Sequence, residues 1–225
     1  MKTLRHWQIS PTDPFALRLA ADARLSQTDY LDDQVWEVAI GQGDEPALAL
    51  HTKYGSRVGL ASLVPMWLHA NRIIYQAQTY VQPPQITVFT PGYIAAEAKI
   101  LPQLALKAEH IAFDSHTVGA LYTLRNDSNQ SITLRMELFA QVGMMGQPQK
   151  LALVTIASGG HALSMGNLDR LAPVVIVENG GIGSNSGSAT SPKIGVNVTI
   201  PAQGETKISG VPLCIQRIFV SPCAG

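Results

Sequence analysis

Most of the chain alternates apolar and polar residues with a period of two, which is the pattern of a strand with one buried face. The clearest example is the pair of segments 117–125 (TVGALYTLR) and 131–142 (SITLRMELFAQV). The linker between them, residues 126–130 (NDSNQ), has the length and polarity of a hairpin loop. The pattern therefore predicts two half-buried antiparallel strands joined as a hairpin.

Shorter segments follow the same pattern and predict further strands. Residues 34–40 and 47–55 flank a turn-forming cluster of Gly, Asp and Pro, which indicates a second hairpin. Residues 193–200 alternate cleanly and, with the turn at 201–205 and the segment after it, are typical of a third hairpin. Pro65 interrupts a strand-rich stretch and predicts a sheet edge or a bulge there. Additional short strands are expected within 57–81, 86–91, 151–158 and 173–179.

Two segments have a composition that favours helices. These are residues 14–25 and 93–111. The second is rich in Ala, Leu, Glu and Lys, although Pro102 would break it, and either segment can be a strand instead. A dozen or more strands packed as two sheets would account for the whole length. We therefore expect an all-β, mainly antiparallel fold, a two-sheet β-supersandwich with few short helices, with residues 1–225 forming a single domain.

Composition excludes two classes of partner. Charged residues make up 14% of the chain, and 16 basic residues balance 16 acidic ones. A nucleic-acid binder or a polybasic membrane-surface protein would carry a basic excess, and no apolar run is long enough for a membrane-spanning helix. So few charges indicate either a face covered by another domain or a second copy of the chain, or a neutral extracytoplasmic β-protein.

The first 15 residues, the cysteines and the histidine spacing bear on the compartment and on cofactors. Residues 1–15 carry Lys2 and Arg5 but lack the apolar stretch of a signal peptide, so we expect a cytoplasmic protein. The two cysteines, Cys214 and Cys223, are too few for a disulfide framework and are expected to be reduced. Because no histidine pair has the spacing of metal ligands, neither a metal nor a cofactor is expected.

A glycine-rich segment at residues 180–192 (GGIGSNSGSATSP) is expected to be a long surface loop. Its opening, GGIG, is similar to a phosphate-binding loop. The Gly-Lys-Ser/Thr ending of a P-loop is missing, however, and a strand pattern follows in place of a helix.

A small stand-alone carbohydrate-active enzyme is one interpretation of the polar residues. Neighbours in a strand point to opposite faces, so local groupings of acids and histidines are more simply solvated strand positions. If the chain is an enzyme, its acid/base pair and an assisting histidine would come from Asp33, Glu37, Glu109, Asp114, His110 and His116.

Aromatic and polar residues near positions 36–67 are the candidate ligand-binding group. Trp36, Tyr54, Arg57 and Trp67 together could stack on a sugar ring and hydrogen-bond its hydroxyls, because aromatic faces suit the apolar side of a pyranose. The alternative is that the tryptophans belong to the core and that Tyr54-Gly55-x-Arg57 is a turn at a strand end.

The same region carries a family resemblance. Residues 22–67 resemble the opening of bacterial glycoside hydrolases of the amylo-α-1,6-glucosidase, or glycogen-debranching, type. The strand–Asn turn–strand unit at 123–138 and the segment VNVTIPAQGETKI at 196–208 give weaker support. The positions that match the opening are Asp33, Trp36, Glu37, Pro46, Thr52, Tyr54, Gly55, Arg57 and Pro65.

The resemblance implies an N-terminal β-supersandwich that packs against an (α/α)₆ barrel, where the catalytic carboxylates of that family lie. The 225 residues contain no positions that match the barrel. The resemblance therefore implies a non-catalytic domain with a structural or carbohydrate-binding role, an α-glucan being the expected sugar and a helical catalytic domain the expected partner. A structural assembly subunit is the other alternative.

Overall fold

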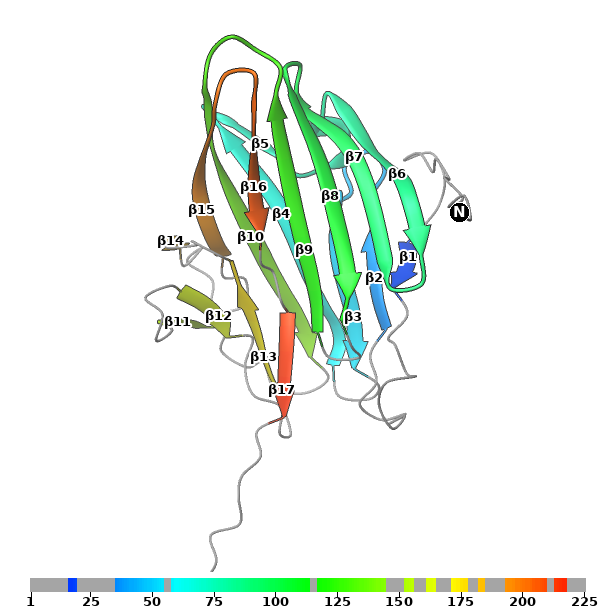
Figure 1. Ribbon diagram of the computed structural model, residues 1–225. Helices are drawn as coiled ribbons and strands as arrows, with labels where there is room; N and C mark the ends of the chain where they lie inside the picture. The colour runs from blue at the N-terminus through cyan, green and yellow to red at the C-terminus, as the bar shows by residue number, and fades with distance from the viewer. Residues whose placement is uncertain are drawn as a thin grey trace, which may run out of the picture.

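Two antiparallel sheets make up the described part of the chain (Figure 1). A computed structural model describes residues 16–19, 35–54, 58–113, 117–144, 152–155, 161–164, 171–177, 182–184, 193–209 and 213–217. Within these ranges every strand pairing is antiparallel.

Sheet 1 has the strand order β1-β2-β3-β4-β10-β15-β14, with β5 paired to β4. Its eight described strands are β1 (Ala16–Leu19), β2 (Val35–Ala39), β3 (Ala49–Tyr54), β4 (Val58–His69), β5 (Arg72–Ile74), β10 (Ile132–Met144), β14 (Ile182–Ser184) and β15 (Lys193–Ile200).

Sheet 2 has the strand order β11-β12-β13-β17-β9-β8-β7-β6, with β16 paired to β9. Its nine described strands are β6 (Gln82–Thr90), β7 (Tyr93–Leu101), β8 (Leu104–Ala112), β9 (Thr117–Asn126), β11 (Ala152–Thr155), β12 (His161–Ser164), β13 (Leu171–Ile176), β16 (Gly204–Ser209) and β17 (Leu213–Arg217).

The hydrophobic core lies between the two sheets, as a period of two along each strand requires. Trp67 on β4 of sheet 1 packs edge-to-face against Tyr122 on β9 of sheet 2, with ring centroids 5.6 Å apart. Inward-facing residues of both sheets join one continuous buried cluster. The predicted all-β, antiparallel, two-sheet class is therefore confirmed.

The hairpin predicted around residues 41–46 is confirmed, because β2 pairs with β3. Pro65 was predicted to mark an edge or a bulge. β4 as a whole is a central strand between β3 and β10, but at Pro65 one side of it is locally an open edge. The β3 pairing extends to Leu63 and the β5 pairing begins at Trp67. Pro65 lies in the gap between them, a position that tolerates the loss of one backbone donor.

The helix considered for residues 93–111 is instead the hairpin of β7 and β8, with Pro102 in the turn. Alternate residues of this segment, such as Ile94, Ala96 and Ile100, are buried in the core. Burial of one face of the sheet overrides the intrinsic helix preference of Ala, Glu and Lys. Residues 16–19 of the other helix candidate form β1, and the rest of that candidate lies outside the described residues.

Two predicted hairpins are wrong in a specific way. The strands at 117–126 and 132–144 exist, but β9 belongs to sheet 2 and β10 to sheet 1. In the same way, β15 and β16 lie in different sheets (Figure 1). Each short linker is thus an arch that carries the chain from one sheet to the other. Alternation shows which face of a strand is buried, but not whether the next strand lies beside it or across the core.

Three residues of the predicted glycine-rich loop, Ile182–Ser184, form β14 on the edge of sheet 1, and the others lie outside the described residues. A short 3₁₀ helix, Ala77–Thr79, is the one helix in the described ranges. The described residues contain no helix long and apolar enough to cross a membrane.

Candidate functional site

The two tryptophans of the predicted ligand-binding group lie in the core. Trp36 on β2 and Trp67 on β4 each have 0% of their surface exposed. The Nε1 of Trp67 donates a hydrogen bond to the Oη of Tyr80 at 3.0 Å. No sugar ring can stack on either indole in this arrangement, so the core alternative is the one that the structure supports.

The other two members of that group do not define a site. Tyr54 is the last residue of β3, and Arg57 lies outside the described residues. Because the two tryptophans are buried, the four residues cannot form one exposed ligand-binding surface.

The acid and histidine candidates for an enzyme that the structure describes lie on different strands, β2 and β8. Glu109 and His110 are neighbours on β8 and point to opposite faces, Glu109 outward and His110 into the core. Burial lowers the pKa of His110 to about 4, and neither of its ring nitrogens has a hydrogen-bond partner among the described residues. His110 is thus a neutral core residue. The candidates Asp33, Asp114 and His116 lie outside the described residues.

Glu37 has a histidine neighbour that the sequence did not indicate. The pairing register aligns Glu37 on β2 with His51 on β3, and His51 with Ser62 on β4. Burial lowers the pKa of His51, although the charge of Glu37 acts in the opposite direction. The side chain of Ser62 is buried, which closes it to a substrate. The cross-strand row of Glu37, His51 and Ser62 is therefore better explained by packing within sheet 1 than by catalysis.

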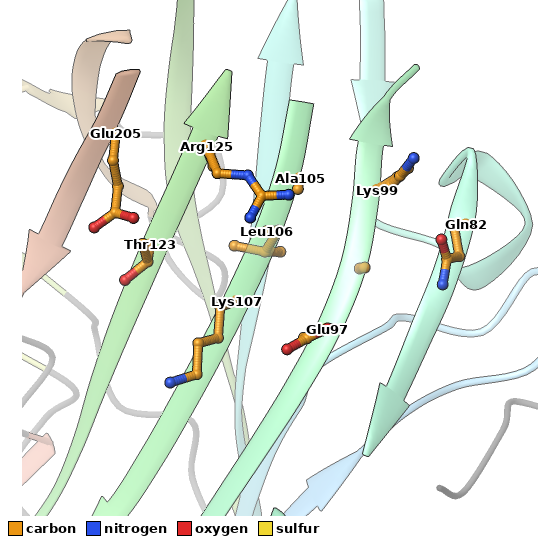
Figure 2. Close-up of a pocket in the computed structure, with 10 residues that line it drawn as sticks. Gln82, Glu97, Lys99, Ala105, Leu106, Lys107, Thr123, Arg125 and Glu205 are labelled. Carbon is orange, nitrogen blue, oxygen red and sulfur yellow. The ribbon is translucent and has the colours of Figure 1, made fainter. Parts of the chain in front are cut away.

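An open hollow of about 250 Å³ lies on the outer face of sheet 2, across β6, β7, β8, β9 and β16 (Figure 2). Cross-strand register sets two polar rows there. One row runs Lys99, Ala105, Arg125 and Glu205, and the next runs Glu97, Lys107, Thr123 and Lys207. The small side chain of Ala105 leaves room between its two basic neighbours, and Arg125 extends toward it from β9 (Figure 2).

Charges on this face are partly paired. The Nζ of Lys107 lies 2.9 Å from Oε1 of Glu109, and the Oη of Tyr93 donates to the same oxygen at 2.6 Å. Partial burial opposes ionisation of Glu109. The two hydrogen bonds and the charges of Lys107 and Lys207 outweigh it and hold the pKa of the carboxyl below its usual value. Partial burial and the bond to Glu109 raise the pKa of Tyr93 to about 12.

Two charged side chains of the hollow remain without a partner. Glu97 and Lys99, both exposed and both on β7, make no ion pair with any described residue. At the other end of the hollow Lys207 lies 3.5 Å from Glu205, an exposed pair that is worth little in water. The hollow therefore presents one unpaired acidic side chain, Glu97, and one unpaired basic side chain, Lys99, to solvent or to a binding partner.

The end of this face beyond Glu109 is apolar. Ile111 is 41% exposed and Phe113 is 58% exposed, and both rank among the large apolar side chains that stand out in solvent. The ring of Phe113 lies over Gly119 on β9, where a Cβ would come within 2.7 Å of its Cε2 atom. Glycine at this position therefore leaves room for the phenyl ring over β9. We call the charged hollow and this apolar end together the outer face of sheet 2.

Sequence reasoning missed this face because residues 93–111 were considered helical. Once the segment is divided at Pro102, alternate residues on each side become polar and outward-facing. That alternation was the available signal. Comparisons with protein-family models and with curated proteins give no match to the chain.

Proposed function

We propose that this chain is a non-catalytic β-sandwich domain that docks onto a helical catalytic domain of the debranching glycoside hydrolase type through the outer face of sheet 2. One observation carries the proposal: the unpaired Glu97 and Lys99 lie on the same sheet face as the exposed Ile111 and Phe113. The sequence resemblance in residues 22–67 supports the class of partner.

The physical basis is the anatomy of protein interfaces. Interfaces combine an apolar patch, which supplies association free energy, with polar groups that fix orientation and exclude wrong partners. Phe113 and Ile111 provide the patch, and Glu97 with Lys99 provides charges of both signs. Helices are the natural layer to cover an open sheet face. The low charge content of the chain agrees with a surface that is normally covered.

Binding in trans tests the docking. The purified chain is mixed with a separately expressed (α/α)₆ barrel domain of a debranching-type glycoside hydrolase, and complex formation is followed by sedimentation velocity. We expect a one-to-one complex. Glu97→Lys and Phe113→Ser should each weaken it at least about tenfold, because the first reverses an unpaired charge of the face and the second removes an apolar anchor. Asp44→Lys, an exposed charge reversal in the β2–β3 turn, is the matched control and should bind normally.

An activity assay tests the non-catalytic part. The chain alone should release no glucose from malto-oligosaccharides or from branched α-glucan. Glucose release that persists after repurification of the chain contradicts the proposal. So does a complex whose affinity neither Glu97→Lys nor Phe113→Ser changes.

A further inference from the structure

A second hollow lies at the end of the sandwich where both arches cross between the sheets. Its volume is about 490 Å³, within the range of small-ligand sites. The β9–β10 arch, the end of β4 and the β7–β8 turn surround it. Side chains that line it include His69, Gln103, Ser128, Asn129, Gln130 and Thr133.

The chemistry of this lining differs from that of the outer face of sheet 2. Apart from Ile132, it consists of amides, hydroxyls and one imidazole, and no lining residue is Asp, Glu, Lys or Arg. Most sites for a metal ion or a phosphate group include at least one charged side chain. Neutral donors and acceptors in alternation instead match a ligand that is itself neutral and rich in hydroxyl groups.

The backbone of the hollow is held rigidly from below. Asn126 is fully buried and forms a central anchor. Its Nδ2 donates to the carbonyl oxygens of Gln130 at 2.7 Å and Pro201 at 3.0 Å. Its Oδ1 accepts from the backbone N of Ser128 at 3.0 Å and from the Ser128 hydroxyl at 2.8 Å. One side chain thus fixes the β9–β10 arch against the β15–β16 arch.

Two further contacts tie the same arch to its surroundings. The backbone N of Asp127 donates to the Gln103 carbonyl at 2.9 Å, and Nε2 of Gln203 donates to the Asp127 carbonyl at 2.7 Å. A loop that is ordered before it meets a ligand loses little conformational entropy on binding. The arch therefore has the rigidity of a binding site.

Several polar groups of the lining remain available for hydrogen bonds to a ligand. The side-chain amides of Gln103 and Gln130 have no hydrogen-bond partner among the described residues. His69 Nδ1 lies 3.1 Å from the Thr133 carbonyl oxygen. Because a carbonyl only accepts, Nδ1 donates this bond, which leaves Nε2 as the ring nitrogen available to a ligand. Each glutamine amide adds a donor and an acceptor side by side, which suits the neighbouring hydroxyls of a sugar.

We propose that this hollow is a binding site for a neutral oligosaccharide, held by the amides of Gln103 and Gln130 and by Nε2 of His69. The site is separate from the outer face of sheet 2. The inference does not rest on the docking proposed above, and either can fail without the other.

Side-chain amide NMR and calorimetry of the full chain test the site. Maltohexaose and cellohexaose are the probes, titrated separately. We expect saturable shifts of the Gln103 and Gln130 NH₂ signals with at least one probe, and a Kd that changes less than twofold between 50 and 500 mM NaCl, because no formal charge is screened. Gln103→Ala and Gln130→Ala should each weaken binding about fivefold, the value of one hydrogen bond.

The matched control is Gln78→Ala, an exposed glutamine outside the lining, which should leave the Kd unchanged. Unchanged backbone spectra show that the variants are folded. Absence of saturable shifts with both probes overturns the proposal. Binding that both lining variants leave intact does so too, as does saturation of the same amides by Ca²⁺ or inorganic phosphate in place of a sugar.

Discussion

Two buried polar side chains of the sandwich have opposite surroundings. Asn126 uses both ends of its amide in hydrogen bonds to two arches. His110, 1% exposed, packs in a T-shaped arrangement with Tyr122 and has no hydrogen-bond partner among the described residues. A buried polar group with all its hydrogen bonds made fixes the local structure. A buried titratable group without such partners destabilises the fold when it becomes charged.

His110 should make the protein sensitive to mild acid. Its pKa is lowered to about 4 in the folded state, while the unfolded chain binds the proton near 6.5. Stability is therefore full above pH 6.5 and falls as the pH drops toward 4, by about 3 kcal/mol in total. Urea unfolding at pH 7.5 and 4.5 measures this, and His110→Leu should lose most of the difference. An equal acid loss in His110→Leu would assign the effect to other groups. His69→Gln, at a histidine outside the core, is the control.

At the scale of elements, the β2–β3 turn shows how local geometry fixes a hairpin. Gly41 and Gly43 both have positive φ, +80° and +52°. A Cβ on Gly41 would lie 2.5 Å from the carbonyl oxygen of Pro46, whereas a Cβ on Gly43 would meet nothing within 4 Å. The two glycines thus share a conformational requirement and differ in steric surroundings.

Alanine substitutions separate these two effects. Gly43→Ala should cost about 1 kcal/mol, the penalty for the left-handed conformation alone. Gly41→Ala should cost at least about 2 kcal/mol more, since the turn must also open to relieve the contact with Pro46. Thermal and urea unfolding of both variants measure the difference. Equal losses would mean that the turn relaxes freely.

Individual strands were predictable from the sequence, and their partners were only partly so. Alternation identified β2, β3, β9, β10 and β15, because burial of one face forces that pattern. The same alternation does not record whether the next strand lies beside the first or across the core. The two arches at Asn126 and Pro201 were therefore predicted as hairpins. Helix propensity concealed β7 and β8, and with them the residues of the outer face of sheet 2.

Across the whole molecule, aromatic residues connect the two sheets. Trp67 of sheet 1 contacts Tyr122 of sheet 2 and donates its indole N–H to Tyr80, which follows the 3₁₀ helix. Burial in this cluster raises the pKa of both tyrosines. From the sequence, Trp36 and Trp67 could be either sugar-stacking groups at the surface or core residues. A single sequence does not distinguish an aromatic ring that fills a core from one that faces a ligand.

Tyr80→Phe tests this connection. The variant keeps the ring but leaves the buried Trp67 N–H without an acceptor, so it should destabilise the fold by about 1 to 3 kcal/mol. In a double-mutant cycle with Trp67→Phe the two losses should not add, because the second change removes the orphaned donor. Guanidinium unfolding measures all four proteins, with Tyr75→Phe as control. Strict additivity would show that the bond contributes nothing.

The two arches also have a consequence for how the protein is made on the ribosome. The free edge of β9 is completed by β16 and β17, and that of β10 by β15, all of which are translated much later. Until residues 193–217 emerge, the nascent chain holds long apolar strands whose edges can pair with other molecules. We therefore expect synthesis of this protein to benefit from chaperones, or from fast completion of translation, during that interval.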